Sequence, residues 1–276
     1  MGRVQFIGGS PLPLCRNSIL SILLQTRTPD KINLWISEEA YLFDQGILDR
    51  DPLKDLLNSC SEKLRDIVSV RWVNNIGPYR KLLPILREAD SGDIIVTADD
   101  DILYGKDWLG ILLDGFKSDP SCAVAARVRR EKVNFFGKKT SYLRWGLVRG
   151  DRILDDNYII TFGGGAVVTR SMFLEDDISD EEYKRLAPTS DDLWYSELLK
   201  RNLVKVRVLS RAFDELELVD HEEGLMRQNL PATKNYLHKI KVWLIDYTLG
   251  YFGYSMCNND LSYSKIKLYF RGKNNA

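Results

Sequence analysis

Three consecutive carboxylates, Asp99, Asp100 and Asp101, follow an apolar run at residues 94–98. The run is β-branched and begins soon after Gly92, which predicts a buried strand of a parallel sheet. Adjacent carboxylates raise one another's pKa values unless a positive charge lies between them. Mg²⁺ can supply that charge, and it typically combines one or two protein carboxylates with substrate phosphates. Because ligands of open α/β sheets bind beyond the carboxyl ends of strands, the cluster predicts a metal–phosphate site, with a solvated acidic turn as the alternative.

A second acidic pair, Asp191 and Asp192, follows Ser190 and precedes an apolar helix expected at residues 193–200. A serine N-cap with acidic residues in the first turn is ordinary helix-start chemistry, so the pair has a purely structural interpretation. The functional interpretation is a general base, because a carboxylate whose pKa is raised by burial or by a neighbour can take a proton from a hydroxyl group. Both interpretations stay open at this point.

Two cations, Arg80 and Lys81, follow Pro78 where the sequence predicts the start of a helix over residues 78–89. Cations in a first turn oppose the helix dipole by roughly a few tenths of a kcal/mol. Their placement is explained if an anion docks there, with Lys81 the better candidate; otherwise both side chains simply reach solvent. Pro84 predicts a kink in this helix or a displaced helix start.

Three consecutive glycines, Gly163, Gly164 and Gly165, precede a strand expected at residues 166–169. Such a run indicates close approach of the backbone to another group, or backbone dihedrals that other residues avoid. A substrate-facing loop and a structural bend are both compatible with this pattern. His221, one of two histidines, lies in an acidic segment and is a further metal-ligand candidate, with a plain surface histidine as the alternative.

Composition narrows the class of protein. The 276 residues include 39 Lys and Arg and 39 Asp and Glu, so the formal net charge is zero, and no basic excess supports a general nucleic-acid binder. Apolar and charged fractions of 44% and 28% are typical of a soluble globular protein. The four cysteines are widely scattered without a CxxC pair, which predicts reduced thiols. With no signal peptide or transmembrane span expected, we predict a cytoplasmic protein.

Strand and helix patterns alternate through the first half of the chain, which predicts an α/β fold with a sheet covered by helices on both faces. The expected strands lie at residues 4–7, 32–36, 67–73, 94–98 and 122–126, and the expected helices at residues 17–25, 52–58, 78–89 and 108–116. Residues 135–156 mix aromatic, basic and glycine residues, as in a surface excursion or an antiparallel insert. A late strand is expected at residues 204–209.

The C-terminal segment differs in character. Aromatic residues lie among lysines over residues 236–256, and the stretch from 265 to 273 is basic. This composition suits an interfacial helix at a membrane surface, and it suits a helix docked on the domain equally well. We expect a catalytic domain at residues 1–230 and a helical appendage at residues 231–276 that contacts the acceptor or a membrane surface.

Taken in order, these motifs resemble the GT-A fold glycosyltransferases, in particular the inverting, GT2-like enzymes of bacterial surface-polysaccharide (lipopolysaccharide or capsule) assembly. The resemblance covers about residues 15–205. It rests on Gln25-Thr26, Pro29 to Ile32, Leu34-Trp35, Gly77 to Leu82, the strand and carboxylates at 94–101 with Trp108, the glycine loop, and Ala187 to Trp194. Residues 8–13 depart from the pattern, because they replace a threonine-rich turn expected after the first strand.

The resemblance implies a Rossmann-like, mostly parallel mixed sheet, a nucleotide-diphosphate sugar as donor, and Mn²⁺ or Mg²⁺ as cofactor. Asp99 and Asp101 match the DxD motif, with Asp101 as the direct metal ligand. Asp192 is the better match to the base of inverting members, with Asp191 next. The residues placed on the donor side are Asp99, Asp100, Lys81, Arg80, Gly164 and Gly165, and the metal set is Asp101, Asp99 and His221.

The predicted function is transfer of a sugar to a hydroxyl of a glycan or lipid-linked oligosaccharide acceptor, with peripheral contact at the inner face of the cytoplasmic membrane through the C-terminal segment. A phosphatase of the haloacid dehalogenase type also places Asp-x-Asp after a buried strand, although normally on the first strand. A sugar nucleotidyltransferase expects a basic, glycine-rich loop near the N-terminus. A catalytically silent sugar-binding module on the same fold is the non-enzyme alternative.

Overall fold

The computed structural model describes residues 2–7, 12–42, 44–219 and 244–274. His221 and the part of the expected 236–256 segment before residue 244 lie outside these residues. The alternation of strands and helices expected in the first half of the chain is present. The described residues fold around a buried apolar cluster to which the sheet and most helices contribute. None of the described helices is both long and apolar enough to cross a membrane.

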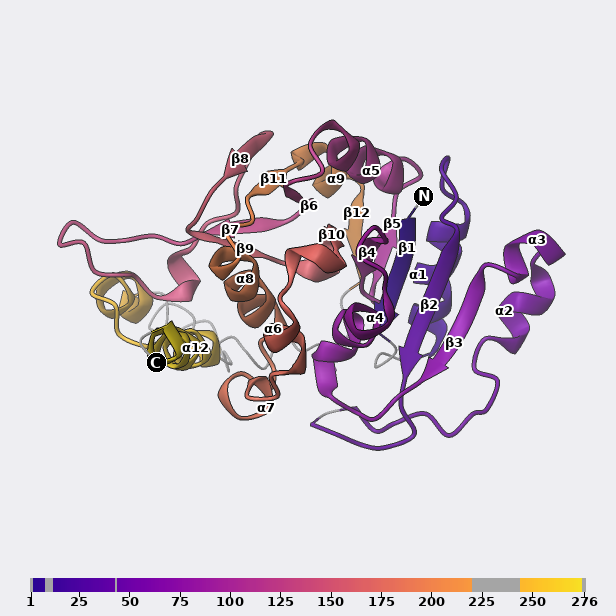
Figure 1. Cartoon of the computed structure of the whole chain (residues 1–276), viewed down its shortest axis with the longest axis horizontal. Helices are drawn as coiled ribbons and strands as arrows, with labels where there is room; N and C mark the ends of the chain where they lie inside the picture. Colours follow the sequence, from indigo (N-terminus) through magenta and orange to yellow (C-terminus); the bar gives the residue numbers. More distant parts are fainter. Residues whose placement is uncertain (1, 8–11, 43, 220–243, 275–276) are drawn as a thin grey trace.

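The central sheet positions every element discussed below (Figure 1). Within the described residues it has eight strands in the order β3-β2-β1-β4-β10-β6-β11-β8. The strands are β1 (Gly2–Ile7), β2 (Lys31–Ile36), β3 (Val68–Trp72), β4 (Ile94–Ala98), β6 (Ala123–Ala125), β8 (Arg152–Leu154), β10 (Ala166–Thr169) and β11 (Val206–Val208). Strands β1 to β4 are parallel, and β10 runs antiparallel to both β4 and β6. The fold is therefore the mixed, mostly parallel α/β architecture that the sequence predicts.

Helices flank this sheet because their apolar residues recur at helical spacing. In the helix α5 (Trp108–Ser118), the buried residues are Trp108, Leu109, Leu112, Leu113 and Phe116, which form one stripe. The other helices are α1 (Leu12–Leu23), α2 (Lys54–Ser59), α3 (Glu62–Arg65), α4 (Leu83–Glu88), α6 (Glu175–Ser179), α7 (Tyr183–Leu186), α8 (Asp191–Arg201), α9 (Ser210–Asp214) and α12 (Asn258–Asn274). Short 3-10 helices lie at Gly77–Lys81, Tyr142–Arg144, Phe162–Gly164 and Arg170–Met172, and a π-helix at Asp246–Gly250.

The helix expected over residues 78–89 is interrupted. A 3-10 helix spans Gly77–Lys81, and α4 begins only at Leu83 with Pro84 in its first turn. A proline lacks the N–H that an interior helical position needs, and a first turn does not need it, so the α-helix restarts at this point as the displaced-start prediction requires. Lys81 therefore closes a 3-10 helix instead of opening an α-helix, which corrects the first-turn placement expected from the sequence.

The segment from 128 to 160 is antiparallel, as one of the two sequence interpretations predicts. Strand β7 (Val128–Arg130) pairs with β9 (Tyr158–Ile160), and an isolated bridge joins Val133 to Lys139. Strand β8 returns to the central sheet and pairs with β11. A further short ladder joins β5 (Ile102–Tyr104) to β12 (Leu216–Leu218), immediately after the three carboxylates.

The C-terminal helix α12 lies along α8 (Figure 1). Its Ile266 and Phe270 are buried in the same apolar cluster as the sheet, and the ring of Phe270 lies 5.0 Å from that of Trp194 on α8. Ser190, at the N-cap position of α8, does not cap the helix with its side chain. Its hydroxyl instead donates to Asn259 Oδ1 at 2.8 Å, which ties the start of α8 to α12.

Candidate functional site

Lys81 joins the two acidic motifs. Its Nζ lies 2.6 Å from Asp99 Oδ1, at the end of β4, and 3.6 Å from Asp191 Oδ2, at the start of α8. The lysine side chain is almost fully buried. Burial by itself disfavours the charged amine, but the carboxylates of Asp99, Asp191 and Asp192 outweigh it and raise the pKa of Lys81 well above its usual range. Neither solvent exposure nor a free anion is needed to explain this cation, because protein carboxylates surround it.

On α8, Asp191 is buried and Asp192 is half-buried, and the surroundings of both disfavour the charged form. Burial, opposed by Lys81 and reinforced by the negative charge of Asp192, raises the pKa of Asp191 to about 7. Burial likewise raises the pKa of Asp192, against the opposing influence of Lys81 and of a hydrogen bond from Phe162 N–H to Asp192 Oδ1 at 2.9 Å. Helix-start chemistry alone would stabilise the charged form, so these raised pKa values distinguish the pair from ordinary first-turn acids.

The glycine loop lies directly against the carboxylates. A Cβ built on Gly163 would collide with the carboxylate of Asp99, so any larger residue there would displace that carboxylate. Gly165 has φ of +105°, and a Cβ on it would lie 2.6 Å from the ring of Trp108. A Cβ built on Gly164 would lie 2.9 Å from the Cβ of Arg127, two residues beyond the end of β6. Both explanations offered for the glycine run, close approach and unusual dihedrals, therefore apply, at different glycines.

Two buried side chains whose role was not expected from the sequence, Thr97 and Tyr104, hold this loop in place. Thr97 on β4 donates to Phe162 O at 2.7 Å and accepts from Ala166 N at 3.1 Å. The hydroxyl of Tyr104 accepts from Asp99 N at 2.7 Å and donates to Gly163 O at 2.8 Å. These two side chains tie the end of β4 to the glycine loop, and no local pattern in the sequence signals such long-range contacts.

Arg80, the second cation of the motif, faces a different partner. Its guanidinium is buried, forms an ion pair with Asp44 and donates from Nε to Gly77 O at 3.3 Å. One of its nitrogens, Nη1, is buried and has no hydrogen-bond partner within the described part of the chain. These contacts join Arg80 to the 44–46 turn, whereas Lys81 joins the carboxylate cluster. A donor contact by Arg80 stays a prediction.

The remaining acidic residues of the triplet lie close by. Asp100 is buried, and its charge contributes to raising the pKa of the buried Cys15 thiol, after the larger effect of burial. Asp101 is half-buried, and its carbonyl accepts from Val219 N at 3.0 Å, beside the short ladder of β5 and β12. Val219 is the last residue described before the segment that contains His221.

The residues fit a metal that arrives with a substrate, and they do not form a complete protein cage. Among the described residues, no group of three or more His, Cys, Asp or Glu side chains is arranged to hold a metal ion alone. Mg²⁺ and similar hard cations, however, are commonly held by one or two carboxylates together with substrate phosphates. Asp191 Oδ2 is buried and has no hydrogen-bond partner in the ranges that the structure describes. Lys81, with a smaller influence of Arg127 on Asp192, faces three carboxylates, so the cluster can accept further positive charge.

Comparison with known proteins gives one family. The model described as "Glycosyl transferase family 2" matches residues 17–175, which include Lys81, the three carboxylates after β4 and the glycine loop. The acidic pair on α8 lies beyond the matched residues. No curated protein sequence matches the chain.

Solved structures with a similar fold include S. aureus TarS 1-349, with 14% identity and a TM-score of 0.48 over 76% of this chain. The chain covers 58% of that TarS structure. Another is 4-diphosphocytidyl-2C-methyl-D-erythritol synthase from Anaerococcus prevotii DSM 20548, with 13% identity and a TM-score of 0.46, covering 82% of this chain and 93% of that one.

Proposed function

The chain belongs to glycosyl transferase family 2, and from that premise we propose that it moves a sugar from a nucleotide-diphosphate sugar to a hydroxyl of a glycan or lipid-linked acceptor, with inversion, in cell-surface polysaccharide biosynthesis. The observation that carries the proposal is the position of Lys81, which brings the end of β4 and the start of α8 to one place. Two acidic motifs far apart in the sequence thereby form one cluster, with a glycine loop closing its side.

The leaving group is assigned to the β4 side of the cluster. We propose that Asp99 and Asp101 hold Mn²⁺ or Mg²⁺ together with the donor diphosphate, where the cation would neutralise the charge that develops on the leaving nucleoside diphosphate. Lys81 contacts Asp99 already and supplies a second positive charge beside the same phosphates. Gly164 and Gly165 allow the donor to approach the backbone closely, because no side chain projects from them.

The acceptor is assigned to the α8 side. Asp192 takes the proton from the acceptor hydroxyl as that oxygen attacks the anomeric carbon from the face opposite the leaving group, which inverts the anomer. The hydrogen bond from Phe162 N–H orients this carboxylate, and the raised pKa makes it a better base than an ordinary aspartate. Asp191, which contacts Lys81, is the alternative base. Burial of Asp191 and partial burial of Asp192 support exclusion of water, whose attack on the donor would compete.

We propose that residues 1–230 form the catalytic unit and that residues 231–276 form an appendage near the acceptor or a membrane surface. Packing of α12 along α8, the helix that begins with Asp191 and Asp192, supports a position close to the acceptor side. A lipid-linked acceptor would place the enzyme at the cytoplasmic face of a membrane.

The test is nucleoside diphosphate release from a panel of nucleotide sugars with Mn²⁺, with and without EDTA. We expect release from one donor class, loss of release with EDTA, and loss of metal-dependent donor binding in Asp101→Ala. Donor affinity in the wild type that EDTA leaves unchanged would exclude the metal role. Free phosphate from simple esters would favour a phosphatase, and donor binding without turnover would favour a silent sugar-binding module.

A further inference from the structure

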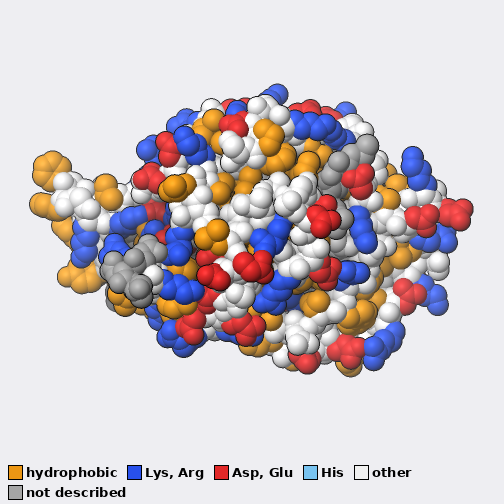
Figure 2. All heavy atoms as spheres, in the orientation of Figure 1, with side chains coloured by type: hydrophobic (Ala, Val, Ile, Leu, Met, Phe, Trp, Pro, Cys, Tyr) orange, Lys and Arg blue, Asp and Glu red, His pale blue; other side chains and the backbone are white. Residues whose placement is uncertain are grey.

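A tight turn after β7 presents two consecutive phenylalanines to solvent. Phe135 is 90% exposed and Phe136 is 73% exposed, and their rings contact each other edge to face at 5.6 Å between centroids. This turn lies in the loop that projects from the end of the molecule opposite β3 (Figure 1), where Figure 2 shows hydrophobic side chains gathered at the tip. Two adjacent exposed aromatics at a projecting tip call for an explanation, because such groups usually mark an interaction surface.

The turn is held rigidly from below. The buried side chain of Asn134 accepts from Phe136 N at 2.9 Å and from Lys138 N at 3.0 Å, and donates to Tyr251 O at 3.0 Å. Tyr251 also accepts from Phe135 N through its hydroxyl at 3.1 Å. Among the described residues, the hydrogen bonds that fix the turn are made by its backbone, Asn134 and Tyr251, and neither phenylalanine ring takes part in them. Both exposed phenylalanine rings are therefore available for contact with another molecule.

The neighbouring surface continues the apolar tip. Val133 is 60% exposed on one side of the phenylalanines. The segment 249–254, which supports the turn, exposes Phe252 and Tyr254, and the amine of Lys138 lies 5.5 Å from the ring of Tyr254. Gly253 packs so closely on the backbone of Lys139 that a Cβ would collide with it, so the two segments form one surface.

The exposed charges of the loop itself have one sign. From Arg129 to Arg144 the chain carries six cations, and its single acid, Glu131, is buried in ion pairs with two lysines. Lys132 and Lys138, on either side of the phenylalanines, are exposed. Lysine is depleted in the cores of protein–protein interfaces, whereas exposed aromatics flanked by lysines suit the boundary between lipid headgroups and acyl chains. Each such lysine adds attraction to an anionic leaflet.

We propose that residues 132–138 dock on an anionic lipid bilayer, with Phe135 and Phe136 inserted at the level of the acyl-chain boundary and Lys132 and Lys138 on lipid phosphates. This surface is distinct from the carboxylate cluster, and it goes beyond the glycosyl transfer proposed above. It also differs from the contact expected from the sequence, because the inserted residues lie in the antiparallel excursion and the segment 249–254 serves as its support.

The experiment is vesicle flotation of the full chain with phosphatidylcholine alone and with phosphatidylcholine plus phosphatidylglycerol. We expect wild type to float with the anionic vesicles, and binding to fall by about tenfold or more in Phe135→Ser/Phe136→Ser, because most of the inserted apolar area is lost. In Lys132→Gln/Lys138→Gln the preference for phosphatidylglycerol and its salt dependence should disappear. Leu48→Ser, which changes a leucine that is 84% exposed elsewhere, is the matched control and should float like wild type.

Thermal melting and donor turnover with a water-soluble acceptor should be unchanged in the phenylalanine variant, since neither ring holds the turn. Failure of wild type to float with anionic vesicles, or equal flotation of wild type and the phenylalanine variant, would overturn the proposal. So would self-association of wild type in solution that the phenylalanine variant abolishes, because the tip would then be covered by a second copy of the chain.

Discussion

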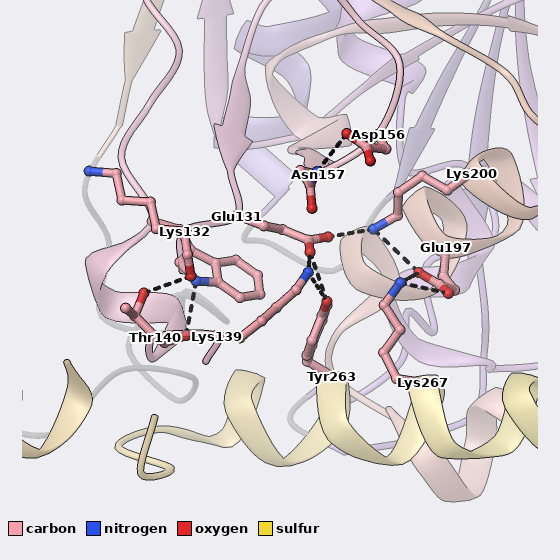
Figure 3. A network of polar contacts seen from close by, with 11 residues as sticks. Glu131, Lys132, Lys139, Thr140, Asp156, Asn157, Glu197, Lys200, Tyr263 and Lys267 are labelled. Atoms are coloured by element: carbon pink, nitrogen blue, oxygen red, sulfur yellow. Dashed lines mark hydrogen bonds and ion pairs between the residues drawn. The ribbon is translucent and has the colours of Figure 1, made fainter. Parts of the chain in front are cut away.

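Two buried ionic clusters in this protein have opposite charge balances. At the end of β4, one lysine, Lys81, faces three carboxylates. Between the antiparallel excursion, α8 and α12, three lysines share two carboxylates and a tyrosine hydroxyl (Figure 3). The members of this Lys–Glu network are Glu131, Glu197, Lys139, Lys200, Lys267 and Tyr263.

Each carboxylate of the Lys–Glu network has lysine partners, and the three lysines outnumber the two carboxylates. Glu131 lies between Lys139 and Lys200, with Lys200 Nζ 2.6 Å from its carboxylate, and Tyr263 donates to it at 2.7 Å. Glu197 contacts Lys200 and Lys267, and these cations outweigh burial and lower its pKa. The surplus of positive charge falls on the lysines: burial and repulsion from neighbouring lysines lower the pKa of Lys139 to about 8 and also lower that of Lys267. The contacts of Lys267 and Tyr263 tie α12 to the rest of the fold.

In the carboxylate cluster at the end of β4, burial and repulsion between carboxylates raise the pKa values of Asp191 and Asp192. Buried ions cost stability unless they are paired, so a cluster left short of positive charge is where a ligand is expected to supply it. Both clusters carry a charge surplus, of lysines in the Lys–Glu network and of carboxylates at the end of β4, and the carboxylate surplus is the one that a bound metal cation could neutralise.

The largest expected effect is on turnover. Asp192→Asn keeps the shape and the hydrogen bond from Phe162 N–H but cannot accept a proton, so kcat should fall by about 10²–10⁴-fold with donor binding retained. Steady-state kinetics and donor titration measure the two quantities separately. Near-normal kcat would move the base elsewhere, with Asp191→Asn as the next variant.

A change in the Lys–Glu network should act on stability alone. Glu131→Gln leaves Lys139 and Lys200 without their shared carboxylate, and removal of one partner of a buried ion pair costs about 3–5 kcal/mol. Chemical denaturation measures the loss, and kcat/KM below the melting transition should match wild type. Lys205→Gln, in an exposed pair with Asp155, is the control and should melt like wild type. A large loss of kcat with unchanged stability would mean that the network acts in catalysis.

Lys81→Met tests whether the carboxylate cluster accepts positive charge from outside. The variant removes the lysine that faces three carboxylates and leaves the smaller influence of Arg127 on Asp192. Two of these carboxylates have raised pKa values and can protonate, so the stability loss in EDTA should be smaller, on the order of 1–3 kcal/mol. Addition of Mn²⁺ should raise the melting temperature of the variant more than that of wild type. An equal response to Mn²⁺ in both proteins would contradict the shared site.

The last expected effect is a dependence of stability on pH. Asp191 has a pKa of about 7 in the folded protein, whereas an unfolded aspartate ionises near the ordinary value of about 4. Between these values the folded state binds more protons than the unfolded state, so in EDTA stability should fall as pH rises from about 4 to 7. Comparison of wild type with Asp191→Asn by denaturation isolates this contribution. A curve that Asp191→Asn does not flatten would show that Asp191 ionises normally.

Much of the fold could be predicted because its signals are local. The apolar run at 94–98 and the strand at 166–169 have the same bounds in the structure, as periodicity and flanking glycines indicate. Pro84 marks the helix restart for the same reason. The N-cap role expected for Ser190 failed, because its hydroxyl is used by Asn259 on a helix far along the chain.

The amino-acid sequence alone indicates the candidate functional residues: an acidic triplet after a strand, an acidic pair opening a helix, a lysine shortly after a proline and a run of glycines. Only the tertiary structure decided that Lys81 lies among three of those carboxylates while Arg80, its neighbour, pairs with Asp44. The fold also places two lysines beside Glu131, whereas Asp191 shares Lys81 with Asp99. The physical reason is that charge balance in a buried cluster depends on which distant side chains share the low-dielectric space, and no local period in the chain records that.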